Sequence, residues 1–109
     1  DTLSARVREA EAQLQLARAE LRGAQVSAEL ADKERSRAQA LSERGLESDK
    51  ALQAAVANAR AAQAAVDTAR ARAVMAGAAL DAAKDDVDRA RIVAPIDGIV
   101  LSRNVEPGS

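Results

Sequence analysis

The sequence predicts a mainly α-helical protein: a long antiparallel two-helix coiled-coil hairpin followed by a short β segment. Three observations lead to this prediction. Apolar residues recur at alternating spacings of four and three along two long stretches, which is the pattern of a coiled-coil seam. A single short break around Gly45 separates these stretches, and after Ile92 the pattern gives way to β-branched residues, Pro and Gly.

The composition fits long helices and excludes several functional classes. The 109 residues include 48% hydrophobic ones, but no Phe, Tyr, Trp, Cys or His; an Ala-, Glu-, Arg- and Leu-rich chain of this kind is typical of long helices. Sixteen basic and seventeen acidic residues are interspersed and leave a net charge of -1, which argues against nucleic-acid binding through a basic surface. The apolar runs are too short to cross a membrane.

The first helix is predicted over residues 2–44. Its apolar residues keep the four-three spacing until Arg35 interrupts it, and Ala38 then resumes it. At about 1.5 Å per residue, such an arm of roughly 40 residues is about 60 Å long. The predicted seam consists of Leu3, Val7, Ala10, Leu14, Ala17, Leu21, Ala24, Ala28 and Ala31.

The second helix is predicted over residues 48–91, with the same spacing and without interruption. Because one arm mirrors the other about Gly45, the two helices are expected to pack against each other with large residues facing small ones. Leu14 would then face Ala76, and Ala10 would face Leu80. The predicted seam consists of Leu52, Ala55, Ala59, Ala62, Val66, Ala69, Ala73, Ala76, Leu80, Ala83, Val87 and Ala90.

The break between the helices contains a helix stop and a helix start, and the tip is predicted at residues 45–47. Gly45 suits the left-handed residue of a Schellman motif, in which Leu46 would fold back onto Leu41. Ser48 is a suitable N-cap for the second helix, and Asp49 would lie favourably at the positive end of its dipole.

Residues 92–109 are predicted to form a separate region. Residues 94–100 read Ala-Pro-Ile-Asp-Gly-Ile-Val, and residues 105–108 read Val-Glu-Pro-Gly. Such β-branched runs between Pro and Gly predict short strands. Too few strands fit here to bury a sheet face, so the segment is expected to be part of a small β domain.

This C-terminal sequence resembles the second half of a biotinyl/lipoyl-like domain. A long helical hairpin leading into such a half is similar to the periplasmic adaptor, or membrane fusion, proteins of tripartite efflux and secretion pumps (HlyD-like, of the MacA or AcrA type). In that family the hairpin is inserted between the two halves of the lipoyl-like domain. The resemblance implies that residues 1–91 are the hairpin and residues 92–109 part of the returning half.

The tip adds a further element of this resemblance. Adaptors that dock on TolC-like outer-membrane channels carry Arg, Leu and Ser spaced as R-x3-L-x6-S around the hairpin turn. Here Arg37, Leu41 and Ser48 have this spacing, across the only break in the helical pattern. The resemblance implies that these three residues form the docking tip.

The family's role supplies the expected function and partners. The chain would belong to a periplasmic adaptor of a Gram-negative bacterium, associated with the inner membrane in the intact protein. It would link an inner-membrane ABC or RND transporter to a TolC-like channel, and copies would associate in a ring, expected to be a hexamer. The sequence leaves open which transporter class is served.

Structural roles alone explain part of this pattern. Leu41 and Ser48 are needed to build the turn in any case, and Arg37 could be a solvated arginine. The alternative function is therefore a coiled-coil spacer or dimerisation rod without channel docking.

The resemblance to a lipoyl-like domain also raises a swinging-arm carrier, in which a lysine at an exposed turn bears the cofactor. This function is disfavoured because no lysine follows Lys84.

No catalytic or cofactor site is expected. The chain lacks His and Cys, and its serines have no partnering base, so the sequence predicts that the protein is not an enzyme. An acidic cluster near the end of the second helix lies among basic residues and is interpreted as a solvated face instead of a metal site. It consists of Asp81, Asp85, Asp86 and Asp88.

Overall fold

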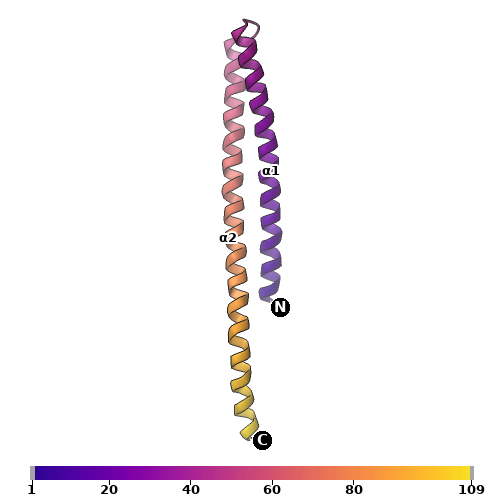
Figure 1. Cartoon of the computed structure of the whole chain (residues 1–109), viewed down its shortest axis with the longest axis vertical. Coiled ribbons are helices and arrows are strands. Elements are labelled where there is room, and N and C mark those ends of the chain that lie inside the picture. The colour runs from indigo at the N-terminus through magenta and orange to yellow at the C-terminus, as the bar shows by residue number, and fades with distance from the viewer. Residues whose placement is uncertain (1, 109) are drawn as a thin grey trace.

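Two long helices and a tight turn form the chain. In the computed structural model, which describes residues 2–108 and the side chains of residues 2–92, α1 spans Thr2–Glu43 and α2 spans Asp49–Gly108. Figure 1 shows the helices running antiparallel from the tip, with α2 continuing beyond the N-terminal end of α1. The molecule measures 95 × 14 × 13 Å. The predicted helical hairpin is therefore confirmed.

The seam between the helices follows the predicted four-three spacing. Every predicted seam residue is buried or half-buried, while most of the residues between them are exposed. The most buried are all apolar, so the helices are held together by burial of apolar side chains along one narrow line. These residues are Ala10, Leu14, Ala17, Val66, Ala69 and Leu80.

Large residues face small ones across this seam. Ala10, Leu14 and Leu80 form a buried cluster, and smaller side chains from both helices pack against it, among them Ala76 and Ala83. The two predicted pairs, Leu14 with Ala76 and Ala10 with Leu80, thus fall within one cluster. A large residue opposite a small one fills the space between two closely approaching helices without forcing their axes apart.

Arg35, which interrupts the heptad pattern, occupies a half-buried seam position. Its guanidinium stays on its own helix: Nε lies 3.0 Å from Asp32 Oδ1, and Nη1 donates to Gln39 Oε1 at 2.8 Å. The aliphatic part of an arginine can cover apolar surface while its charged end remains in water. One arginine is thus accommodated without disturbing the seam.

The β segment expected at residues 92–109 is not shown. The backbone of α2 continues as helix to Gly108, and no strand is present among residues 2–108. The physical reason is that strands need partner strands to satisfy their backbone groups, whereas a helix satisfies them locally. A sequence pattern that resembles half of a sheet therefore has no partner within this chain.

Within residues 2–108, neither helix has a stretch long and apolar enough to cross a membrane.

Candidate docking site at the hairpin tip

The turn at the end of α1 has the geometry of a Schellman motif. Gly45 adopts φ 73°, the left-handed conformation that glycine reaches without steric cost. The Leu46 N–H donates to the Leu41 carbonyl at 2.8 Å, and the Gly45 N–H donates to the Ser42 carbonyl at 3.0 Å. These are the two hydrogen bonds that define the motif. Gly45 therefore ends α1 where the sequence predicts a stop.

Ser48 begins α2 as its N-cap. Its Oγ accepts a hydrogen bond from the Ala51 N–H at 3.1 Å, and its carbonyl accepts one from the Leu52 N–H at 3.1 Å. The side chain thereby satisfies one of the free N–H groups of the first turn. Asp49 provides the negative charge in that turn, where the helix dipole favours it.

The two leucines of the tip differ in exposure. Leu41 is half-buried, while 69% of Leu46 is exposed. The backbone of Leu46 does fold back onto Leu41, as the hydrogen bond shows, but its side chain stays largely in solvent. A large apolar side chain at the end of a rod is therefore available for contact with another molecule.

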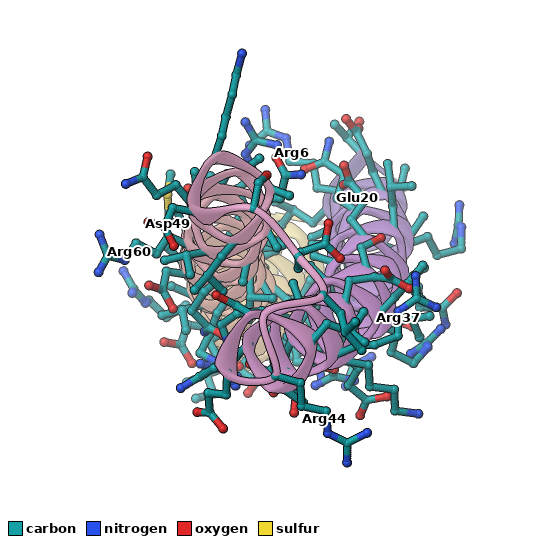
Figure 2. All side chains as sticks on the ribbon, turned by 90° about the horizontal axis from the view of Figure 1, so that it is seen from above. Arg6, Glu20, Arg37, Arg44, Asp49 and Arg60 are labelled. Carbon is teal, nitrogen blue, oxygen red and sulfur yellow. The ribbon has the colours of Figure 1, made fainter. Side chains whose placement is uncertain are left out.

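Arg37 lies two turns before the end of α1, and 72% of its side chain is exposed. Its Nη2 lies 3.6 Å from Glu34 Oε2 on the preceding turn, a separation that gives an exposed pair little net stabilisation. Figure 2, seen from the tip, shows Arg37 and Arg44 pointing outward from the hairpin. The guanidinium of Arg37 keeps most of its hydrogen-bond donors free for a partner.

A shallow hollow of about 210 Å³ joins both helices beside Arg37. Glu34 and Arg37 line it from α1, and Glu47 lines it from beyond the turn together with small side chains of α2. Glu47 belongs to the predicted tip but was not among the predicted site residues, because only the fold brings it next to Arg37. Glu34 could have been predicted, since residues three apart on a helix are neighbours. The full lining is Glu34, Arg37, Ala38, Glu47, Ala51 and Ala55.

A second hollow, of about 430 Å³, continues from the first towards the middle of the rod. Leu30 and Ala31 of α1 and several alanines of α2 line it, and it shares Glu34, Ala51 and Ala55 with the first hollow. The surface beside the tip is thus an apolar groove that ends at a cation flanked by two carboxylates. Such a surface suits contact with another helix.

The three docking residues predicted from the sequence lie in different surroundings. Arg37 is exposed on the flank of α1, Leu41 is half-buried near the seam, and Ser48 is exposed while its Oγ caps α2. The structure therefore does not gather them into one cluster of side chains. The predicted acidic cluster of α2 is exposed, and the described residues hold no group of three acidic side chains arranged to bind a metal.

No protein-family model, curated protein or solved structure matches this chain.

Proposed function

We propose that this chain is the hairpin of a periplasmic adaptor in a tripartite efflux or secretion pump, and that its tip docks on a TolC-like outer-membrane channel. In this proposal the rod sets the distance between an inner-membrane ABC or RND transporter and the channel. Residues 92–109 would pair with a further segment of the intact protein to complete a lipoyl-like domain.

The observation that carries the proposal is the combination of side chains at the tip. The Schellman turn and the serine cap account for the backbone there, but neither requires an outward-pointing Arg37 or an exposed Leu46. An exposed cation beside a groove between two helices, together with an exposed apolar side chain at the end of the rod, is what a helical partner would recognise.

The first test is in-cell crosslinking in the intact protein. A cysteine at position 37 or 44 is expected to crosslink to the channel, because both arginines point outward at the tip (Figure 2). The matched control is Arg60→Cys, which is also exposed but lies on the shaft of α2. Crosslinks of equal yield from positions 37 and 60 would contradict docking through the tip.

The second test is Arg37→Asp in the intact protein. The proposal predicts loss of pump function with unchanged helicity and melting temperature, because Arg37 makes only one long, exposed ion pair. The control is Arg44→Asp, which changes the charge of the tip without touching the predicted motif. A matching loss of helicity in Arg37→Asp would mean that Arg37 has a structural role instead.

A structural rod that acts as a spacer or dimerisation element is the second candidate. The heptad seam is sufficient for it, and exposed apolar residues along the shaft favour contacts between rods. The two candidates differ in what Arg37→Asp does, because a spacer would tolerate this substitution.

A further inference from the structure

Two grooves flank the seam in the half of the hairpin nearer the tip. One is the apolar groove beside Arg37, formed by the hollows of about 210 and 430 Å³. The other is formed by two further hollows, of about 570 and 440 Å³. Side chains of α1 and α2 line both grooves, but the grooves have no residue in common. The hairpin therefore offers two different surfaces, one on each side of the seam.

The second groove is charged, and we name it the charged groove. Guanidinium groups from both helices and two carboxylates of α1 line it. In Figure 2, Arg60 lies on the opposite side of the hairpin from Arg37, as expected for grooves on the two sides of the seam. Covering these side chains would remove water from several charges at once, which is costly unless each of them finds a partner. The charged residues are Glu29, Asp32, Arg35, Arg60 and Arg70.

The apolar groove has uncharged walls over most of its length. Leu30 lines it from α1 and Ala54 lines it from α2. Because 62% of Leu30 is exposed, the hairpin itself leaves this leucine mostly uncovered. The α2 wall consists mainly of alanines, which allow another helix to approach closely. The uncharged part includes Ser27, Leu30, Ala31, Ala54, Ala55 and Asn58.

The same walls continue towards the open end of the hairpin. Residues seven apart lie on the same face of a coiled-coil helix, so Gly23 and Ala61, both exposed, extend the two walls. The first charge on the α1 wall is Glu20, which lies 14 residues before Glu34 at the tip end of the groove. The uncharged surface between these two carboxylates is therefore about 21 Å long, the length of about four helical turns.

Negative charge predominates at the tip end of the apolar groove. Glu34 and Glu47 line the hollow there together with Arg37, so the carboxylates outnumber the cation. Arg37 Nη2 lies 3.6 Å from Glu34 Oε2, whereas Glu47 takes part in no ion pair among the described side chains. Glu47 is half-buried, and charges that are partly shielded from water are screened less by salt. A basic side chain of a partner would therefore be attracted to Glu47.

We propose that the apolar groove binds one amphipathic helix of a separate partner protein, with a basic side chain of that helix next to Glu47. Apolar side chains of the partner helix would lie against Leu30 and between the alanines of α2, so that large residues again meet small ones. A helix of about 14 residues fits the uncharged length, and the charge at the tip end would fix its direction. The contact runs along the shaft, so the inference goes beyond docking of the tip and does not depend on it.

The first test uses a synthetic helical peptide as the probe and the whole chain as its receptor. The peptide has about 18 residues, or five helical turns, with leucines at four-three spacing, alanine and glutamine elsewhere, and one lysine near its C-terminus. We expect saturable binding of one peptide per chain, measured by fluorescence anisotropy of a labelled peptide. Absence of binding at a chain concentration of about 1 mM would overturn the proposal.

A substitution in the groove shows where the peptide binds. Ala54→Arg places a charged side chain in the apolar groove and should weaken peptide binding at least about tenfold, because the peptide would cover an unpaired charge. Ala57→Arg is the matched control: the same substitution is made three residues further along α2, at an exposed position that lines neither groove.

Circular dichroism should show unchanged helicity for both variants, since Ala54 and Ala57 are exposed. Equal losses of binding in the two variants would mean that the peptide adheres to apolar surface without specificity, and would overturn the proposal.

The second test addresses the charge at the tip end of the groove. A peptide with glutamate in place of its lysine should bind the wild-type chain at least about threefold more weakly. Glu47→Lys should reverse this preference, because it changes the sign of the unpaired group. Glu43→Lys is the control: it makes the same change at an exposed residue outside both grooves and should keep the wild-type preference. Equal binding of both peptides to the wild type would overturn the proposed chemistry of the partner.

Sedimentation equilibrium of the chain without peptide separates a partner helix from a second copy of this chain. We expect Ala54→Arg to leave the association state of the chain unchanged. If a second copy occupied the apolar groove, the wild type would associate through it, and Ala54→Arg would prevent this association while Ala57→Arg would not. That result would overturn the assignment of the groove to a separate partner.

Discussion

The seam and the tip of this hairpin are stabilised by different interactions. Along the seam, the buried residues are all apolar and are ordered by size, with Leu14 and Leu80 filling the space beside small neighbours. At the tip, Gly45 and Ser48 act through backbone conformation and hydrogen bonds. The stability of the hairpin should therefore depend on side-chain volume at seam positions, and on backbone conformation and capping at tip positions.

The largest effect is expected in the seam. Leu14→Ala should lower the free energy of unfolding by about 2–3 kcal/mol, because it leaves a space in the buried cluster around Leu80. Leu16→Ala is the matched control two residues away, and its exposure predicts a change within about 0.5 kcal/mol. Urea unfolding of dilute samples measures both, and similar losses for the two leucines would contradict the assigned seam.

The next effect is expected at the turn. Gly45→Ala should destabilise the hairpin by about 1–2 kcal/mol, because alanine is strained at φ 73° although no atom blocks its Cβ. Gly23→Ala has equally open space but lies inside α1, and should stabilise the chain by about 1 kcal/mol. Thermal melts followed by circular dichroism should shift in opposite directions, and shifts of the same sign would refute this account.

A smaller loss is expected at the N-cap. Ser48→Ala removes the acceptor for the Ala51 N–H and should cost about 1 kcal/mol. Ser48→Asp keeps an acceptor and adds a favourable charge at the helix start, so its stability should equal or exceed that of the wild type. Amide hydrogen exchange at Ala51 would locate the effect, and faster exchange in both variants would speak against the cap.

The smallest change in stability is expected at Arg37. Arg37→Ala removes one ion pair of 3.6 Å on an exposed side chain, and the free energy of unfolding should change by no more than about 0.5 kcal/mol. Urea unfolding of dilute samples is again the measurement. A larger loss of stability would mean that Arg37 helps to stabilise the tip, and it would weaken the case for docking.

Local sequence rules were sufficient for most of the fold. The four-three spacing predicted the buried residues of both helices, because a narrow seam between two helices has only this geometry available. Gly45 predicted the turn for a similarly local reason, since few residues accept a positive φ. Both features depend on residues close in sequence or on one regular repeat.

Features that depend on the whole chain were harder to predict. Glu47 joins Arg37 around one hollow only because the turn brings α2 beside α1, and the exposure of Leu46 follows from where its side chain points after the turn. The composition of residues 92–109 indicated strands, but strand pairing is decided by partner strands instead of local pattern. The exposed residues Leu16, Val26 and Leu30 also fit a four-three spacing, which by itself does not say which line of residues is buried.

The position of the turn also has a kinetic consequence. Residues that meet near Gly45 are close in sequence, whereas Val7 and Ala83, which pack on the same cluster towards the open end of the hairpin, are far apart in sequence. The entropy cost of closing the chain between two partners rises with their separation, so the helices should zip from the tip towards the open end. Gly45→Ala should then mainly slow folding, and Leu14→Ala should mainly speed unfolding. The tip would thus serve as the nucleus for folding of the rod.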